Sequence, residues 1–593
     1  MYQGFEEIKG SGTTRKSGLP DTSSIYAAED PRFLHFPSRR SVVHSAGGMV
    51  SSTQPLANEA GYRVLAAGGN AADAAVAMAA ALNVTEPSST GVGGDLFCLF
   101  YEGATGRVRA LNGSGRAPAA STLEAVRAAG IAGPEIPYDD ILGATVPGAA
   151  AGLVDVVERF GSGALTLAQI LQPAIDLAET GFPVSEISAY QWQASENLIR
   201  RASDNHAEIL SKSHPGRAPR AGEIMKNPTL AETFRTIARE GKDGFYRGRI
   251  AEEIVKLVRQ RGGLMTLDDL ANHTSTPCEP ISVKYAGLDV WEHPPNGQGL
   301  VALLTLGLLD ILQKEGRVPN LSEMDHNSAE YLHVIIECLR IAFADCRYHV
   351  TDPEHMATSV EQLLSPEYLK ERAAIFDPTR CRADIKHGSP ENSSDTVYFS
   401  TVDADGNACS FIISNYAGFG TAAVPKGCGF TLQNRGCNFT LKEGHPNCIA
   451  PNKRPYHTII PAMVTREDQS LWACYGVMGA FMQPQGHVQV LCNMIHHNLT
   501  PQTALDAPRV CVGAALPDVD GHIEAKVYIE DGISDDVMNA LRQLGHDVEK
   551  LEHFKRGMFG RGQVIRSHVD GDQTVLSGGS DPRGDGAALP CTR

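Results

Sequence analysis

Thr396 lies at the start of a stretch typical of a β-strand, and its side chain carries a hydroxyl. Residues 396–402 are mostly β-branched or aromatic, and the turn-forming stretch 403–407 separates them from a second strand-like stretch, 408–414. The pattern predicts a β-hairpin that begins at Thr396. A hydroxyl in this place becomes a nucleophile only if a base removes its proton. Taken alone, an Asp-Thr step before a strand is more typical of an ordinary loop-to-strand boundary.

Motifs of other enzyme classes are missing from the sequence. It contains no Gly-x-Ser-x-Gly, no His-Glu-x-x-His, and no Gly-x-Gly-x-x-Gly between a strand and a helix. The glycine-rich stretch 86–95 lacks the Gly-Lys-Ser/Thr ending of a phosphate loop and runs into a predicted strand instead of a helix. His496 and His497 have no carboxylate at ligand spacing and are expected at the surface. The sequence therefore predicts no cofactor and no metal site.

Several motifs follow Thr396 in a fixed order. They are Ser414-Asn415-Tyr416, Gly418-Phe419-Gly420, Leu-Gln-Asn-Arg-Gly at 432–436, Arg-Pro-Tyr-His-Thr-Ile-Ile-Pro at 454–461, Gly-Val-Met-Gly at 476–479 and Gly-Gly-Ser-Asp-Pro-Arg-Gly-Asp-Gly at 578–586. Together they resemble the γ-glutamyltransferase (glutathione hydrolase) family of N-terminal-nucleophile hydrolases, in the branch that includes glutathione hydrolase-like proteins and oxamate amidohydrolase. The resemblance covers about residues 41–587.

The resemblance implies that an inactive precursor cuts itself between Asp395 and Thr396. The freed α-amine, with a reference pKa of about 7.7–8.0, then serves as the base for the hydroxyl of the same residue. The implied fold is an α+β, four-layer αββα sandwich built jointly by a large chain, 41–395, and a small chain, 396–593. Residues 1–40 are expected to be a flexible lead-in, and 378–394 to be a mobile linker before the scissile bond.

The resemblance also implies roles for five residues near the nucleophile. A second hydroxyl that orients the nucleophile is matched by Ser414. The oxyanion hole, formed by backbone N–H groups of a turn, is matched by Gly479 and Ala480, and an alanine preserves the N–H donor. A pair that contacts the substrate carboxylate is matched by His457 and Thr458. For His457 a purely structural role is an equally open interpretation.

Four positions depart from the family pattern. Where the family has an arginine that clamps the substrate α-carboxylate, this sequence has Ser114, with Arg116 two residues later. Where the family has two acceptors for the substrate α-ammonium, it has Arg435 and Asn438. A guanidinium cannot accept a hydrogen bond and repels an ammonium. The natural acyl group is therefore expected to offer a carboxylate or carbonyl to Arg435, unless Arg435 belongs to a structural ion pair.

Charge and composition narrow the class of protein further. The formal net charge of −17 argues against nucleic-acid binding, 42% of the residues are hydrophobic, and no 18-residue apolar run is present. Residues 1–40 do not resemble a secretory signal, and the thirteen cysteines form no Cys-x-x-Cys pair, so a cytoplasmic protein without a disulfide framework is expected.

The sequence thus predicts a self-processing Thr amidohydrolase that acts on a γ-glutamyl or related small acyl amide. The expected partners are a small-molecule amide substrate and the two chains of one precursor, without nucleic acid or membrane, and the oligomeric state is not predicted. Two alternatives remain open: an oxamate-type amidohydrolase or acylase without γ-glutamyl activity, and an uncleaved, non-catalytic scaffold of the same fold.

The strands and helices expected to position these residues do not alternate strictly along the chain. A doubly wound fold is therefore not predicted. The expected elements are helices at 54–67, 71–82, 300–313, 328–349, 486–496, 501–507 and 533–544, and strands at 96–101, 107–112, 396–402, 408–414, 562–565 and 575–577.

Overall fold

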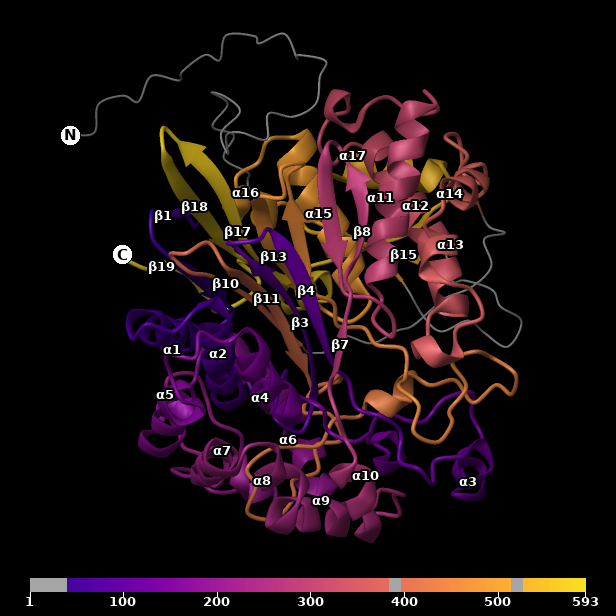
Figure 1. The fold of residues 1–593 in the computed structure, drawn as a ribbon. Coiled ribbons are helices and arrows are strands. Elements are labelled where there is room, and N and C mark those ends of the chain that lie inside the picture. The colour runs from indigo at the N-terminus through magenta and orange to yellow at the C-terminus, as the bar shows by residue number, and fades with distance from the viewer. Residues whose placement is uncertain (1–39, 383–395, 514–525, 593) are drawn as a thin grey trace, which may run out of the picture.

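Two seven-stranded antiparallel sheets lie face to face in the computed structural model, which describes residues 40–382, 396–513 and 526–592 (Figure 1). The first sheet has the order β1 (Val43–Ser45), β18 (Gln573–Ser580), β17 (Arg561–Asp570), β13 (Leu471–Met478), β12 (Ala462–Thr465), β9 (Leu288–Glu292) and β8 (Ile281–Tyr285). The second has the order β19 (Ala587–Pro590), β2 (Met49–Ser52), β10 (Val397–Val402), β11 (Ala408–Ser414), β3 (Asp95–Glu102), β4 (Arg107–Gly113) and β7 (Thr276–Cys278). Each sheet contains strands from both sides of residue 396.

Helices cover the outer face of each sheet (Figure 1). Over the second sheet lie α1 (Pro55–Ala66), α2 (Ala71–Thr85), α4 (Ala149–Phe160), α5 (Leu167–Thr180), α6 (Glu186–Ala202), α7 (Pro228–Glu240), α8 (Lys242–Tyr246), α9 (Gly248–Gln260) and α10 (Leu267–Ala271). Over the first lie α11 (Gly299–Lys314), α12 (Ala329–His349), α13 (Val360–Leu363), α14 (Pro366–Ala373), α15 (Met482–His496), α16 (Pro501–Asp506) and α17 (Asp535–Gln543). The predicted four-layer αββα sandwich is confirmed.

Smaller elements lie at the edges of these layers. They are α3 (Leu123–Ala128), the two-stranded sheet of β5 (Phe182–Pro183) and β6 (Ile224–Met225), and the three-stranded sheet of β14 (Val510–Val512), β15 (Lys526–Glu530) and β16 (Asp547–Leu551). The predicted helices and strands all occur, with boundaries shifted by a few residues. The lead-in up to residue 39, the linker residues 383–394 and Asp395 lie outside the described part of the chain.

The buried helix α2 shows how the sequence builds the helical layer that packs against β10 and β11. Asn70 caps it by accepting hydrogen bonds from the N–H groups of Ala72 and Asp73, and every one of its fifteen residues is buried. Small alanine side chains let α2 approach the sheet closely, and it contacts both β10 and β11. A helix that is apolar on all sides is stable only when it is surrounded by protein.

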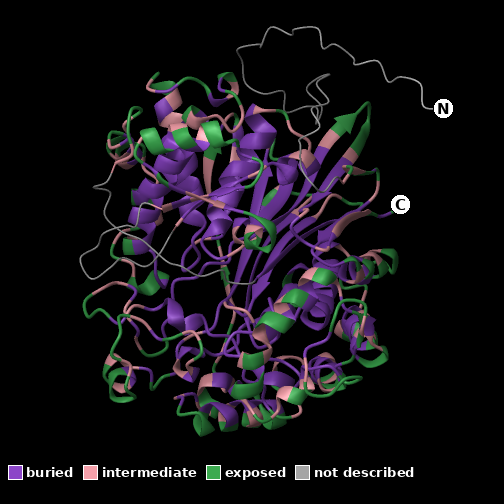
Figure 2. Ribbon diagram, turned by 180° about the vertical axis from the view of Figure 1, so that it is seen from behind, coloured by how far each residue is buried: buried purple, intermediate pink, exposed green. Residues whose placement is uncertain are grey.

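The β10–β11 hairpin lies in the middle of the second sheet. β10 pairs with β2 on one side and β11 on the other, and β11 pairs with β3 so that Ser414 lies opposite Asp95. Thr396 directly precedes β10, and the register Val397–Ile413 brings it to the end of β11 where Ser414 lies. The hairpin is buried on both faces (Figure 2).

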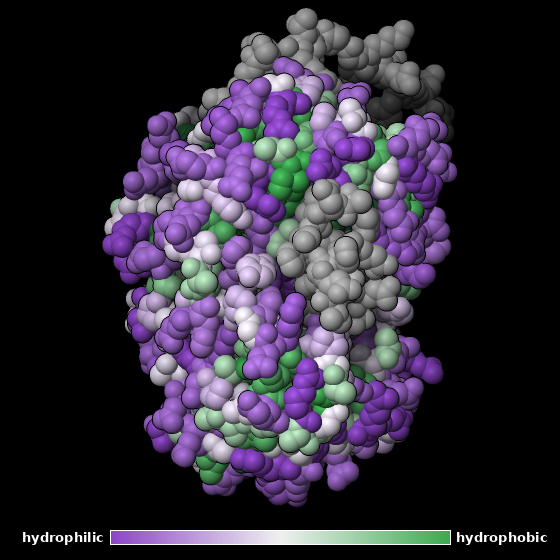
Figure 3. All heavy atoms as spheres, turned by 90° about the vertical axis from the view of Figure 1, so that its right-hand side faces the viewer, coloured by the Kyte–Doolittle hydropathy of each residue, from purple (hydrophilic) through white to green (hydrophobic). Residues whose placement is uncertain are grey.

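Apolar side chains from the two sheets fill the space between them, among them Met49, Leu99, Met463 and Ile565. The outer surface is mostly hydrophilic on the face that Figure 3 shows, with small scattered apolar areas. Among the described residues, no helix combines the length and the apolar character that crossing a lipid bilayer requires.

Candidate active site

The Thr396 and Ser414 hydroxyls face each other at the open end of the β10–β11 hairpin. Their oxygens lie 2.9 Å apart, and both side chains are fully buried. Ser414 Oγ also accepts hydrogen bonds from the N–H of Tyr416, at 2.8 Å, and from Arg435 NH2, at 3.2 Å. A serine oxygen has two lone pairs, so these donors occupy both. The Ser414 proton is then directed to Thr396 Oγ1, which leaves the Thr396 proton free to leave toward a base.

Arg435 is placed inside the site by a short 3₁₀ turn, Arg435–Asn438, and its side chain is fully buried. Its NH1 donates to Thr458 Oγ1 at 2.7 Å, and its guanidinium carbon lies 4.3 Å from the centre of the Tyr416 ring. Its Nε lies 4.0 Å from Asp95 Oδ2, at the outer limit of an ion pair. Arg435 therefore has a structural counter-charge and also contacts Ser414. A role in a structural ion pair and a role facing the acyl group are thus compatible.

Asp95 is the buried acid of the site, and no sequence motif pointed to it. Its Oδ1 accepts hydrogen bonds from the N–H of Gly115 at 2.7 Å and from Gln433 Nε2 at 3.0 Å. Burial raises the pKa of Asp95 to about 6, and the charge of Arg435 partly opposes that rise. The carboxylate is thus held in a low-dielectric environment by donors and by a guanidinium, as a buried charge requires.

His457 supports Asp95 as a neutral donor. Its Nδ1 accepts a hydrogen bond from the N–H of Ile459 at 3.3 Å, so the proton is on Nε2, which donates to Asp95 Oδ2 at 3.1 Å. Burial, reinforced by the charge of Arg435, holds the pKa of His457 well below its usual value. His457 therefore contacts Asp95, whereas its neighbour Thr458 contacts Arg435.

The Gly479–Ala480 turn joins β13 to α15. Gly479 has a φ of 129° and Ala480 a φ of 48°, a left-handed conformation that is unfavourable for a non-glycine residue. Strained residues of this kind occur often at active sites because the surrounding structure holds them in place. Ala480 O accepts a hydrogen bond from Gln298 Nε2 at 2.8 Å, which fixes the turn.

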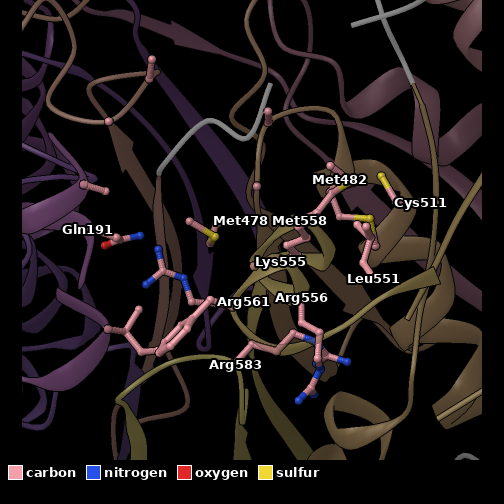
Figure 4. A pocket seen from close by; sticks show the side chains of 18 of the residues that line it. Gln191, Met478, Met482, Cys511, Leu551, Lys555, Arg556, Met558, Arg561 and Arg583 are labelled. Atoms are coloured by element: carbon pink, nitrogen blue, oxygen red, sulfur yellow. The ribbon is translucent and has the colours of Figure 1, made fainter. Parts of the chain in front are cut away.

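A cleft of about 1110 Å³ opens beside this turn, and Gly479 and Ala480 form part of its wall. Met482, Leu551 and Cys511 lie together at one end of the cleft, and Gln191 and Arg561 at the other (Figure 4). At its rim, the exposed rings of Tyr190 and Phe554 are stacked with centroids 4.4 Å apart. The cleft is wide enough for a bulky group next to the turn, and its methionine side chains adapt readily to different shapes.

The remaining predicted site residues, Asn438, Ser114 and Arg116, differ in their surroundings. Asn438 is buried, and its Nδ2 has no hydrogen-bond partner among the described residues. Ser114 Oγ accepts a hydrogen bond from Asn296 Nδ2 at 3.1 Å. Arg116 donates to Thr274 O at 3.4 Å, and its described hydrogen bonds do not reach Thr396. Hydrogen bonds thus connect Thr396 through Ser414 to Arg435 and on to Thr458, whereas the described hydrogen bond of Arg116 leads to Thr274.

The predicted surface position of His496 is wrong, because the ring is buried and its Nε2 lies 2.8 Å from Tyr285 Oη. A different group, Glu337, Cys381 and His546, has potential metal-ligand atoms within 4.8 Å of one another. However, Arg340 NH1 lies 2.7 Å from Glu337 Oε1 and 2.8 Å from Cys381 Sγ. A guanidinium thus already supplies the positive charge in that cluster.

The glycine-rich stretch before β3 is the sequence feature that could have indicated a role for Asp95. A Cβ added to Gly94 would lie 2.3 Å from Ser414 O, and one added to Gly93 would lie 2.2 Å from Thr431 O. Only glycine allows these close approaches. The stretch therefore brings Asp95 against the hairpin, which is a reason for its composition that a phosphate loop does not provide.

Comparison with known proteins agrees with this geometry. The gamma-glutamyltranspeptidase family model matches residues 57–591. The chain is 36% identical over 542 residues to the glutathione hydrolase-like YwrD proenzyme of Bacillus subtilis, covering 91% of this chain and 98% of that one. It is 34% identical over 551 residues to the oxamate amidohydrolase proenzyme of Klebsiella pneumoniae, with 92% and 98% coverage.

Among solved structures, the cephalosporin acylase of Bacillus halodurans superposes with a TM-score of 0.82 at 40% identity, covering 95% of this chain and 99% of that one. The fold is thus that of an N-terminal-nucleophile hydrolase, and the chain is an enzyme that hydrolyses amides and is made as a proenzyme. More particularly, the chain belongs to the gamma-glutamyltranspeptidase family, and the expected branch is confirmed.

Proposed function

We propose that the chain cuts itself between Asp395 and Thr396 and that Thr396 of the resulting small chain, 396–593, carries the acyl group during amide hydrolysis. The observation that carries this proposal is the buried Thr396–Ser414 pair, with oxygens 2.9 Å apart, at the start of β10. Because strands on both sides of residue 396 build each sheet, the large chain, 41–395, stays bound after cleavage.

The reaction follows from the positions of these groups. The α-amine of Thr396 takes the proton of its own hydroxyl, and Oγ1 attacks the amide carbon of the substrate. The N–H groups of Gly479 and Ala480 stabilise the oxyanion, and the amine leaves with the proton that the α-amine returns. Water, activated by the same amine, then hydrolyses the ester, releases the acid and regenerates Thr396. A second amine in place of water would give transfer.

The acyl group is proposed to carry a carboxylate or carbonyl next to the scissile bond. Arg435 supports this, because its guanidinium touches Ser414 and Thr458 and would repel an α-ammonium at that place. The oxamate amidohydrolase relative has a substrate of this kind in its name. Glutathione hydrolysis is the second candidate, because several relatives are named for it.

The leaving amine is proposed to occupy the cleft beside Gly479 and Ala480. The cleft of about 1110 Å³ is larger than a small amine requires, and it is lined by methionines and by the rings of Tyr190 and Phe554. This supports an acylase able to accept a bulky amine, as does the similarity to the cephalosporin acylase.

A mass-spectrometric trap tests the proposal directly. The purified protein is quenched in acid during turnover of oxamate or of a γ-glutamyl anilide, and the two chains are separated. An acyl mass on the N-terminal residue of a chain that begins at Thr396 is expected, and the mass itself identifies the preferred acyl group. An uncut chain without acyl adduct would favour the non-catalytic scaffold.

A reducing compartment is proposed as well, and the cytoplasm is the one that fits the expected absence of a disulfide framework. All thirteen cysteines are free thiols in the structure, and ten of them are buried. Titration of thiols in the denatured, unreduced protein is expected to find all thirteen. Several disulfides in protein isolated without reductant would contradict this prediction.

A further inference from the structure

Gln298 is a fully buried glutamine whose side chain joins two parts of the candidate site. Its Nε2 donates to Ala480 O at 2.8 Å and to Thr458 O at 2.6 Å, and its Oε1 accepts a hydrogen bond from Tyr456 Oη at 3.1 Å. A side-chain amide has two N–H donors, and here both are used. Because two carbonyls face one end of the amide, only Nε2 fits at that end, and the orientation of the side chain is fixed.

The backbone of Gln298 is held as firmly as its side chain. Its N–H donates to His457 O at 3.0 Å. Gln298 also directly precedes the buried helix α11, whose first residue is Gly299. A Cβ added to Gly299 would lie 2.6 Å from His293 O, so this corner of the chain is closely packed. The amide is therefore placed by a rigid part of the fold.

The turn that Gln298 contacts, Gly479–Ala480, has a buried N–H group. Gly479 O accepts a hydrogen bond at 2.8 Å from the N–H of Met482, the first residue of α15. A trans peptide group is planar with its N–H opposite to its carbonyl, so the N–H of Ala480 points away from Met482. Ala480 is 4% exposed, and its N–H makes no hydrogen bond within the described part of the chain. A buried donor of this kind needs an acceptor, which the oxyanion of the proposed reaction would supply.

The shape of this turn depends on contacts from its surroundings. Ala480 adopts a left-handed conformation, which a non-glycine residue keeps only where neighbouring groups hold it. Two donors meet at Ala480 O, namely Gln298 Nε2 at 2.8 Å and the N–H of Gln483 at 3.3 Å. The second donor belongs to α15, which continues from the turn itself. The first comes from the proposed large chain, so Gln298 holds the turn from across the chain boundary.

We propose that Gln298 is a positioning residue that holds Ala480 and Thr458 in one arrangement. The oxyanion donor on Ala480 and the contact between Arg435 and Thr458 then act on the same acyl group. The inference rests on the proposed amidohydrolase function. Thr458 Oγ1 accepts a hydrogen bond from Arg435 NH1 at 2.7 Å, whereas Thr458 O accepts one from Gln298. One amide of the large chain thus sets the geometry of acyl recognition and of transition-state stabilisation together.

Gln298→Met and Gln298→Glu test the proposal in the mature, two-chain protein, with oxamate and a γ-glutamyl anilide as substrates. Methionine has nearly the same length but no donor, so kcat is expected to fall by about 10-fold, because the oxyanion donor is no longer held in place. Glutamate has the same shape but turns a carboxylate toward two carbonyls, so a fall of about 100-fold is expected. KM for the anilide should change by less than about threefold, because the oxyanion contact is made only in the transition state.

The link to Arg435 provides a second measurement. Because Thr458 also loses a contact in Gln298→Met, oxamate hydrolysis is expected to fall about threefold further than anilide hydrolysis. In the Arg435→Gln background this additional loss should disappear, since the contact through which it acts is already gone. A residue that only fills space would lower both activities equally in both backgrounds.

The matched control is Gln489→Met in α15. Gln489 is also buried, and its Nε2 also donates to two backbone carbonyls, Gln485 O at 3.0 Å and Val510 O at 2.9 Å. These bonds do not involve the turn or Thr458, so turnover per active site is expected to stay unchanged. The mass signal of the acyl group on Thr396 counts active sites in each variant, which separates slower turnover from a smaller folded fraction.

Tyr456→Phe is a milder variant that removes the hydroxyl on Gln298 Oε1 and leaves the amide in place. We expect kcat to fall by about threefold, as for the loss of one hydrogen bond. If the Gln298 variants are not cut into two chains, this variant decides the question alone.

Falls of kcat that increase from Tyr456→Phe through Gln298→Met to Gln298→Glu, at equal numbers of active sites, support the inference. Unchanged turnover per active site in these variants would overturn it, and so would a loss that Gln489→Met shares. If the wild type itself forms no acyl-Thr396, the proposed reaction fails and the inference falls with it. If the wild type is acylated and the variants turn over normally, only the role of Gln298 is refuted.

Discussion

Replacing Thr396 with alanine is expected to give one uncut chain of 593 residues without amidase activity. The substitution removes the hydroxyl that attacks the Asp395–Thr396 bond and, after cleavage, the substrate. Loss of the nucleophile should lower kcat by at least about a thousandfold. A denaturing gel with N-terminal sequencing checks the cleavage, and anilide hydrolysis checks the activity.

Thr396→Ser and Ser414→Ala distinguish the chemistry from a folding defect. Serine keeps a hydroxyl on the same backbone, so a chain with Ser at 396 should still be cut, although more slowly. Alanine at 414 removes the proton donated to Thr396 Oγ1 without removing the nucleophile, so cleavage and turnover should both slow but persist. A Thr396→Ala protein that still yields a chain starting at residue 396 would show that another group performs the cleavage.

The sequence was sufficient to predict most helices and strands of the layers, because these are local patterns, whereas the layered arrangement and the role of Thr396 as nucleophile were implied by the family resemblance. The β-branched and aromatic residues identified β10 and β11 with nearly correct boundaries, and the stretch 71–82 was correctly predicted to be a helix. The pairing of each sheet from strands on both sides of residue 396 came only from the family resemblance. No local pattern specifies partners that are hundreds of residues apart.

The acidic partner of Arg435 could not be predicted in the same way. Asp95 and Arg435 are 340 residues apart in sequence, and only the β3–β11 register brings Asp95 beside the hairpin. The direction of a long side chain also decides function: Arg116 is close to the expected clamp in sequence, yet it turns toward Thr274.

Arg435→Gln is expected to change which amides the enzyme prefers. In the wild type, the guanidinium contacts both Ser414 and Thr458, and in the proposed reaction it would face the acyl group next to the scissile bond. A glutamine cannot attract a carboxylate there, and it no longer repels an ammonium. Breaking a buried charge pair typically costs about 3–5 kcal/mol, so oxamate hydrolysis should fall by about 100-fold or more.

Hydrolysis of a γ-glutamyl anilide should fall much less in the same variant. Some loss is expected because Arg435 also donates to Ser414 Oγ, which orients the nucleophile. The ratio of kcat/KM for oxamate to that for the anilide is therefore the quantity to measure, and the variant must first be shown to be cut into two chains. Thr458→Val provides the matched control, because it removes a hydrogen-bond partner of Arg435 and leaves the charge.

Asp95→Asn separates the two roles of Arg435. It leaves the guanidinium buried without its anionic neighbour, so the free energy of unfolding should fall by a few kcal/mol. Adding Arg435→Gln to this variant should recover part of that loss, because no unpaired charge then remains. If Arg435→Gln slows both substrates equally, and the double variant recovers stability but no selectivity, Arg435 serves only the ion pair. Glutathione hydrolysis would then be the better assignment, because nothing at this place would discriminate against an α-ammonium.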